Sequence, residues 1–192
     1  MSATLLRLPS ADDALARRAR EIAIRLTEWP SVTGTRDEAA FALRLAGFLR
    51  SLPCFDGRPD DVVLAPIPGD PLGRANVIAV VPGAGDGACV LAGHFDVVPV
   101  DDYGDLKPLA FSPEPLREAI VARLEATGEN PQALEDLRSG AFLPGRGLLD
   151  MKAGLAAGIA ALEAFAADPA RRGNVVLVAT PDEEDRSTGM RA

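Results

Sequence analysis

The sequence predicts an α/β layer fold, in which helices pack against a central sheet of buried strands. Two observations predict it. Runs of strand length that are almost entirely apolar occur at residues 75–81, 88–92 and 173–180. Amphipathic patterns of helical period precede these runs and separate them. With 192 residues, 47% of them hydrophobic and 25% charged, the chain has the composition of one globular domain with a real core.

Composition also excludes several classes of function. The formal net charge is −8 and no basic cluster offsets it, which argues against a nucleic-acid partner. The apolar runs are too short to cross a bilayer, and residues 1–10 carry no signal-peptide pattern, so we expect no membrane partner and a cytoplasmic location. Two cysteines, Cys54 and Cys89, do not make a disulfide framework, and we expect both to be free thiols.

The first half of the chain begins with two predicted helices. An apolar stripe predicts a helix over 11–27, and a second helix follows from Thr35 to about Leu52. Thr35 and Glu38 have the spacing of a capping box. We expect the two helices to form a packed pair that covers the sheet. Their predicted core faces are Leu15, Ala19, Ile22 and Leu26 in the first, and Phe41, Leu45, Phe48 and Leu52 in the second.

Three strands are predicted next, a short one at 62–64 and two longer ones at 75–81 and 88–92. The tight connection at 83–87 predicts that the two longer strands are neighbours in a hairpin-like pair. Since both are almost entirely apolar, we expect them to be covered on both faces.

Residues 101–139 are predicted to form a helical excursion from the sheet. Ser112-Pro113 and Asn130-Pro131 are typical helix starts, and apolar stripes follow each of them. A helix to about Ala167 then leads to the strand at 173–180. Gly154 and Gly158 would let that helix approach the sheet or another helix closely.

His94, the only histidine of the chain, follows the apolar run at 88–92, and Asp96 lies two positions later. Side chains two apart on an extended chain point to the same side, so one can bind a metal while the other steadies it. A His-x-Asp pair alone is more often a surface or hydrogen-bonded pair. Whether this pair is a metal site or a hydrogen-bonded surface pair therefore depends on the other residues of the chain.

Two further acidic groups lie at comparable places. Asp150 follows a glycine-containing turn and precedes a helix, and Glu183 and Glu184 follow the last strand. Taken singly, Asp150 could be a helix N-cap and the glutamates a solvated turn. Together with His94 they favour a site, because strand ends and helix starts converge on one edge of an α/β sheet. Imidazole and carboxylates are zinc ligands, and a neighbouring glutamate that does not bind metal can act as general base. Since adjacent side chains on an extended chain point in opposite directions, we expect one of Glu183 and Glu184 to bind metal while the other faces the substrate.

Three motifs carry a resemblance to a known family. They are Gly93-His94-x-Asp96-Val97-Val98-Pro99, Gly145-Arg146-Gly147-x-x-Asp150-Met151-Lys152 and Ala179-Thr180-Pro181-Asp182-Glu183-Glu184. In this order they resemble the co-catalytic zinc family of aminoacylase, carboxypeptidase G, acetylornithine deacetylase and succinyl-diaminopimelate desuccinylase. The segment from Tyr103 to Phe111 and the helical excursion are more similar to the arginine-utilisation, RocB-type branch.

The resemblance implies a three-layer, zinc-exopeptidase-like catalytic domain with a central mixed sheet flanked by helices. It implies that His94 binds one zinc ion, Glu184 binds a second, and Asp150 bridges the two. Glu183 would be the general base that activates a metal-bridging water, and Asp96 would orient His94. Cobalt or manganese can substitute for zinc. The implied reaction is hydrolysis of an amide bond in an N-acyl amino acid or short peptide, and the Asp150-Met151 bond is expected to be cis.

The chain also departs from the family pattern. The family site needs a later acidic ligand and a second histidine, and the family carries a small lid and dimerisation domain. We therefore expect residues 1–192 to be the N-terminal part of a catalytic domain, as a shortened chain, a fragment or the product of a broken gene. Such a chain would have little or no turnover. The alternative is a non-catalytic relic or binding module that keeps the fold, and a homo-oligomer is compatible with either.

Overall fold

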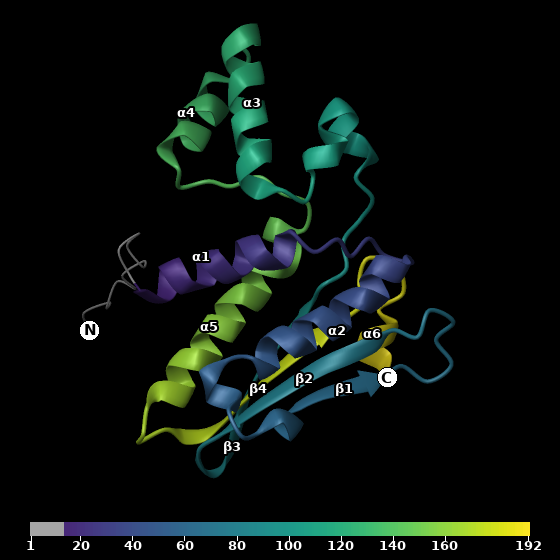
Figure 1. The fold of residues 1–192 in the computed structure, drawn as a ribbon, viewed down its shortest axis with the longest axis vertical. Helices are drawn as coiled ribbons and strands as arrows, with labels where there is room; N and C mark the ends of the chain where they lie inside the picture. Colours follow the sequence, from purple (N-terminus) through teal and green to yellow (C-terminus); the bar gives the residue numbers. More distant parts are fainter. Residues whose placement is uncertain (1–13) are drawn as a thin grey trace, which may run out of the picture.

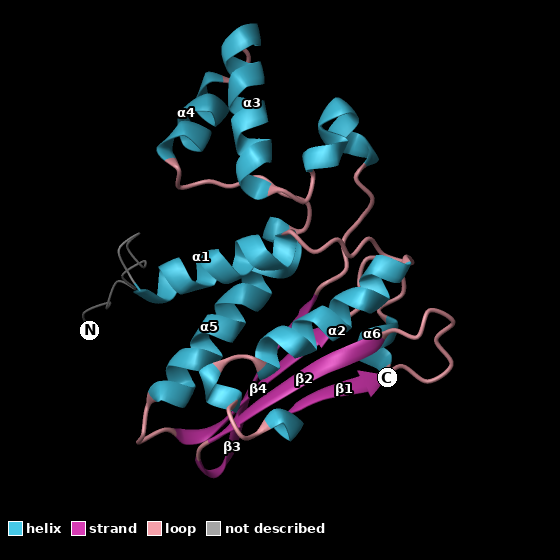
Figure 2. Cartoon of the chain, in the orientation of Figure 1, coloured by secondary structure: helices cyan, strands magenta, loops and turns pink. Residues whose placement is uncertain are grey.

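A computed structural model describes residues 14–192 and shows a four-stranded mixed sheet with helices packed against it (Figures 1 and 2). The predicted mixed α/β fold is confirmed. The predictions for residues 1–13, which include the absence of a signal peptide and the start of the first helix, lie outside the described residues. The helices are α1 (Ala14–Thr27), α2 (Arg36–Arg50), α3 (Pro113–Thr127), α4 (Pro131–Ser139), α5 (Ala153–Ala167) and α6 (Thr188–Arg191), and the strands are β1 (Val62–Pro66), β2 (Ala75–Pro82), β3 (Ala84–His94) and β4 (Arg172–Thr180).

The strand order is β1-β2-β4-β3, with β2 antiparallel to both of its neighbours and β3 parallel to β4. The expected hairpin of β2 and β3 is therefore wrong, because β4 lies between them. Residues 175–179 of β4 are all apolar. In its central place β4 pairs along both edges, with Val175 opposite Val81 of β2 and Val176 opposite Val90 of β3. Since β3 and β4 are parallel, they end together, with His94 opposite Thr180. This register brings two of the sequence motifs to one edge of the sheet.

The chain passes from β2 to β3 through Gly83, which lies against the backbone at the start of β4. A Cβ atom at Gly83 would lie 2.3 Å from the carbonyl oxygen of Gly173 and 2.9 Å from that of Arg171. We expect Gly83→Ala to lower the free energy of unfolding by about 1–3 kcal/mol, because rigid backbone has to move. Urea denaturation measures it. Gly87→Ala is the matched control, since a Cβ there meets nothing within 4 Å; equal losses in the two variants would contradict the close approach.

The core lies between one face of the sheet and helices α2 and α5 (Figure 1). The predicted core face of α2 is confirmed, and Phe41 and Leu45 are fully buried. Gly158 permits the expected close approach of α5 to the sheet. A Cβ atom added at Gly158 would lie only 3.2 Å from the side chain of Leu177 in β4. The capping box is wrong: the Thr35 hydroxyl donates to the carbonyl of Val32 (2.6 Å), and the Glu38 carboxylate accepts from the amide of Gly34 (2.7 Å).

Helix α1 packs mainly along α5, where Arg18 donates to Glu163 at 2.8 Å. The expected pairing of the first two helices is therefore wrong. Ile22 and Leu26 are buried as predicted, but Leu15 is 45% exposed, because the contact with the core begins further along α1.

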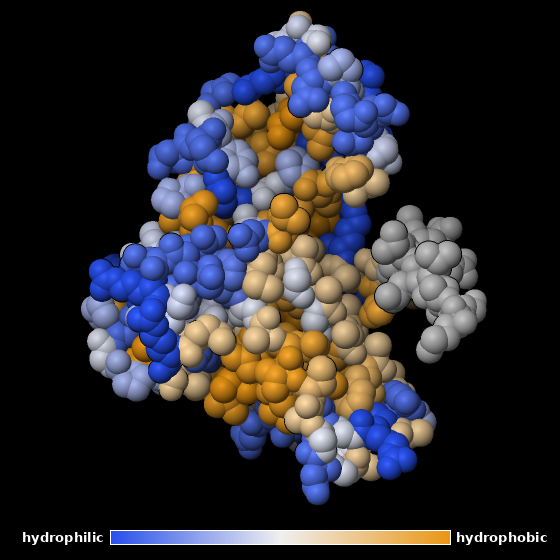
Figure 3. All heavy atoms as spheres, turned by 180° about the vertical axis from the view of Figure 1, so that it is seen from behind, coloured by the Kyte–Doolittle hydropathy of each residue, from blue (hydrophilic) through white to orange (hydrophobic). Residues whose placement is uncertain are grey.

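The opposite face of the sheet is apolar and only partly covered by the described elements. Ile78, Val80, Val176 and Val178 are half-buried there, and Val90 is 58% exposed. Figure 3 shows this apolar area from behind. Short helix α6 packs at its edge, where the Asn76 amide donates to the Gly189 carbonyl at 2.8 Å. The expected burial on both faces is wrong for β3, which is exposed along most of its length, and holds only in part for β2, because the described elements cover this face only in part.

Residues 101–139 form the predicted helical excursion, which stands off the sheet (Figure 1). Leu116 anchors α3 and is fully buried, and α4 packs against α3.

Cys54 and Cys89 are free, as expected. Among residues 14–192, the structure has no helix with the length and apolar character needed to cross a membrane.

Candidate metal centre

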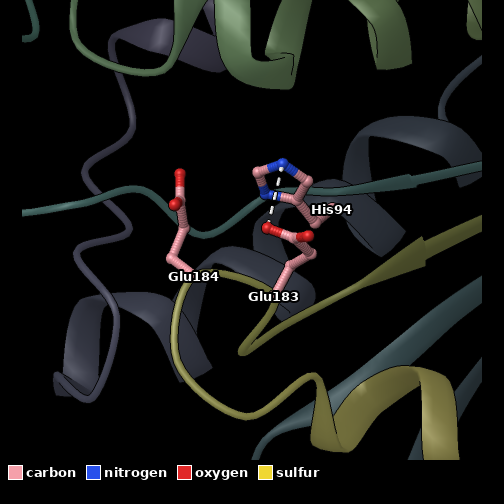
Figure 4. A group of neighbouring side chains, drawn as sticks. All are labelled: His94, Glu183 and Glu184. Carbon is pink, nitrogen blue, oxygen red and sulfur yellow. Dashed lines mark ion pairs between the residues drawn. The ribbon is translucent and has the colours of Figure 1, made fainter.

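His94 and the pair Glu183 and Glu184 meet at the edge of the sheet where β3 and β4 end. His94 is the last residue of β3, and the turn that follows β4 carries the two glutamates. Figure 4 shows both carboxylates on the same side of this turn as the imidazole. One nitrogen or oxygen atom from each of the three residues lies within 4.8 Å of the others. The Nε2 atom of His94 is 3.7 Å from a carboxylate oxygen of Glu183.

The two glutamates were expected to point in opposite directions, as neighbours on an extended chain do. This expectation is wrong, because the chain turns after Thr180. Asp182 has a left-handed backbone with φ of 67°, which sends Glu183 and Glu184 together toward His94. The geometry alone does not separate a ligand role from a base role for these two residues.

Asp150 reaches the same place from a third element. It lies in an irregular turn, Leu148–Lys152, and its Oδ1 is 3.0 Å from Nε2 of His94. The N-cap interpretation is wrong, because α5 begins three residues later, at Ala153. Gly147 makes the turn with φ of 77°. The Asp150-Met151 peptide bond is cis, as the resemblance implied.

Asp96 is fully buried behind the imidazole and holds the glutamate turn. Its carboxylate accepts hydrogen bonds from the backbone amides of Glu183 (3.0 Å) and Glu184 (3.1 Å). It also accepts from the hydroxyl of Thr33 at 2.9 Å. The Nδ1 atom of His94 lies 3.0 Å from the backbone oxygen of Asp96 and 3.6 Å from its carboxylate. A proton on Nδ1 satisfies these oxygens and leaves Nε2 facing Asp150 and Glu183.

The electrostatics of the site favour a positive charge at its centre. Burial lowers the pKa of His94, but hydrogen bonds to Asp96 and Asp150 outweigh it and raise the pKa to about 9. Burial raises the pKa of Asp96, yet the bonds from His94 and from the two glutamate amides hold it below its usual range. Burial and the nearby carboxylates raise the pKa of Glu184. Crowded carboxylates of this kind are stabilised when a cation lies between them.

The donor set fits a zinc ion. Imidazole nitrogen and carboxylate oxygen are both zinc ligands, whereas magnesium and calcium prefer oxygen ligands alone. His94, Asp150, Glu183 and Glu184 converge from three elements, and Asp96 stands behind the imidazole as an outer carboxylate does at many metal sites. The five residues expected from the sequence are thus brought together.

Sequence reasoning missed several buried polar residues that support these five. Lys152 is fully buried, and its ammonium donates to the backbone oxygen of Trp29 at 2.7 Å and lies 4.7 Å from the Phe41 ring centre. It ties the turn of Asp150 to the end of α1. Thr33 supports Asp96, and Arg74 bonds to Asp182 at 2.6 Å. Arg74 and Thr33 are far from the three motifs in the sequence, so no spacing pattern connected them with the site.

Comparison with known proteins places this chain in a family. The sequence pattern of peptidase family M20/M25/M40 matches residues 90–192. The protein YqjN of Bacillus subtilis is 38% identical over 166 residues, which are 86% of this chain and 29% of YqjN. RocB of the same organism is 33% identical over 180 residues, covering 92% of this chain and 31% of RocB. The chain therefore spans about three tenths of the length of these relatives.

Among solved structures, an M20 family metallo-carboxypeptidase from Sulfolobus solfataricus, Sso-CP2, is similar with a TM-score of 0.56. The sequences are 20% identical, and the match covers 86% of this chain and 31% of Sso-CP2, so the likeness concerns the fold. The match to RocB supports the predicted RocB-type branch. On the match over residues 90–192, which contains His94, Asp150, Glu183 and Glu184, the chain belongs to peptidase family M20/M25/M40, a family of hydrolases.

Proposed function

We propose that the chain is the metal-binding part of the catalytic domain of a zinc-dependent amidohydrolase or exopeptidase, acting on an N-acyl amino acid or a short peptide. The convergence of His94, Asp150, Glu183 and Glu184 at the ends of β3 and β4 carries this proposal. Membership of a peptidase family supports it. Because the chain matches RocB, we propose more specifically that the hydrolase acts in arginine utilisation.

In this proposal His94, Asp150 and Glu184 hold the metal. Zinc held by these residues would supply Lewis-acid activation of the substrate carbonyl and of the attacking water. Glu183, whose side chain is 47% exposed, faces the open side and takes the proton from the attacking water. It then gives the proton to the leaving amine. Asp96 fixes the imidazole and the backbone of the glutamate turn, so both carboxylates are in place before substrate arrives.

We further propose that the chain by itself binds one zinc ion and does not hydrolyse substrate. The resemblance implies a second histidine and a later acidic ligand for the second ion, and this sequence has one histidine. Hydrolysis of N-acetyl amino acids by the purified chain, lost with a chelator and in Glu183→Ala, would contradict this part of the proposal. A folded chain that binds no zinc would instead favour the non-catalytic relic.

The two glutamates give a test of their different roles. We expect Glu184→Ala to weaken zinc binding by about tenfold or more, because it removes a ligand, which corresponds to at least ~1.4 kcal/mol. Glu183→Gln keeps the size of the side chain and is expected to change zinc binding less. Competition titration against a coloured chelator measures both. A larger loss in Glu183→Gln would reverse the assignment of ligand and base.

A further inference from the structure

Arg74 lies buried beside the site, surrounded by three carboxylates. Its side chain is 8% exposed, and those of Glu38, Asp70 and Asp182 are 0 to 3% exposed. The guanidinium donates to Asp182 at 2.6 Å, to Asp70 at 2.7 and 3.0 Å, and to both oxygens of Glu38 at 3.2 Å. These carboxylates come from α2, from the loop before β2 and from the turn after β4. One side chain therefore joins three segments that are distant in the sequence.

Asp182 connects Arg74 to the candidate metal ligands, since it directly precedes Glu183 and Glu184. Its backbone is left-handed, a conformation that non-glycine residues adopt only when their surroundings hold them there. Besides the bond from Arg74, its carboxylate accepts from the Thr188 hydroxyl at 2.5 Å and the Thr188 amide at 3.2 Å. The contacts of this carboxylate therefore help to set the direction in which the glutamates leave the sheet.

The hydrogen bonds continue back to Asp96 and form a closed ring. Glu38, which Arg74 contacts, accepts from the Gly34 amide at 2.7 Å. The neighbouring Thr33 donates to Asp96 at 2.9 Å, and Asp96 accepts from the amides that follow Asp182. The glutamate turn is therefore held from two sides, by Asp96 on its amides and by Arg74 on the side chain before them.

An arginine is required at this position by geometry as well as by charge. The planar guanidinium reaches Asp182, Asp70 and Glu38 at once, whereas a lysine ammonium is a single point that cannot span all three. Without the guanidinium, three buried carboxylates would face one another without a partner, and their repulsion would move them apart. This movement displaces Asp182 and, with it, the turn.

We propose that Arg74 is a positioning residue, which fixes the Glu183 and Glu184 turn through Asp182 and thereby sets the metal affinity of the site. This inference rests on the proposed function, because it assigns a role relative to the same metal ligands. Arg74 touches neither His94 nor the two glutamates in the described bonds; it acts through Asp182.

The test compares zinc affinity in the full 192-residue chain for the wild type, Arg74→Lys and Thr188→Ala. We expect Arg74→Lys to weaken zinc binding by about 10–100-fold, the usual loss when an outer partner of a metal site is changed. Thr188→Ala removes one bond to Asp182 from a half-buried position and is expected to cause a smaller, several-fold loss. The absorption spectrum of the cobalt-loaded chain should change in both variants, since the ligand geometry changes.

Arg18→Lys is the matched control, because Arg18 also makes two bonds to a carboxylate on another element, Glu163, but lies away from the site. Its zinc affinity should stay within about twofold of the wild type, as expected for a half-exposed ion pair. If Arg74→Lys and Thr188→Ala both fold, bind zinc with wild-type affinity and leave the cobalt spectrum unchanged, the role of Arg74 is overturned while the proposed function stands. If Arg74→Lys does not fold, Thr188→Ala decides. Failure of the wild-type chain to bind zinc would overturn the proposed function and this inference with it.

Discussion

Replacing His94 by alanine is expected to abolish zinc binding at micromolar zinc, a loss of about 100-fold or more, or at least ~2.7 kcal/mol. His94 is the only imidazole of the chain, and its Nε2 is the atom on which Asp150 and Glu183 converge. The remaining carboxylates would form an exposed acidic cluster without a nitrogen ligand. Competition titration of the purified chain with a coloured chelator measures the change.

Asp185→Asn is the matched control for this prediction. Asp185 is an exposed carboxylate in the same turn, paired with Arg186 and outside the group that surrounds His94. Its replacement should leave zinc affinity unchanged. Equal affinity in His94→Ala and the wild type would show that zinc binds elsewhere in the chain.

Replacing Phe41 by alanine is expected to have the largest effect on stability, a loss of about 3–5 kcal/mol in the free energy of unfolding. Phe41 is fully buried, its ring stacks on Phe95 with centres 4.8 Å apart, and it contacts Trp29 edge-on at 5.8 Å. The ammonium of Lys152 also lies over its face. The substitution leaves a cavity between α2, the end of β3 and the turn of Asp150.

Leu43→Ala, two positions along the same helix, is the control, since Leu43 is 65% exposed. We expect its free energy of unfolding to stay within about 0.5 kcal/mol of the wild type. Urea denaturation, followed by circular dichroism, compares the two variants. A loss below about 1 kcal/mol in Phe41→Ala, a third of the smallest expected value, would contradict the central place of this ring in the core.

The sequence predicted the elements of this fold better than their arrangement. The apolar runs of β2 and β4 and the periodicity of α2 and α5 are local properties, so they were visible in single segments. Strand order depends on which distant runs pair. The short β2–β3 connection favoured a hairpin, but β4 buries more apolar surface in the central position and separates the two strands.

The candidate site shows the same division. His94, Asp96, Asp150, Glu183 and Glu184 stand in three compact motifs, and parallel pairing of β3 with β4 explains why two of these motifs meet. The buried groups that hold them, such as Thr33, Arg74 and Lys152, are single residues whose partners are set by tertiary contacts. Expectations that assumed regular backbone failed where the chain turns sharply, at Asp182 and at the start of α5.

X-ray absorption at the zinc edge of the chain loaded with one equivalent of zinc tests the central claim most directly. The proposed site predicts nitrogen and oxygen ligands at about 2.0–2.2 Å, with the outer-shell scattering of one imidazole, and loss of that imidazole signal in His94→Ala. A sulfur ligand at about 2.3 Å would place the ion on Cys54 or Cys89 and contradict the assignment of His94, Asp150 and Glu184 as the zinc ligands.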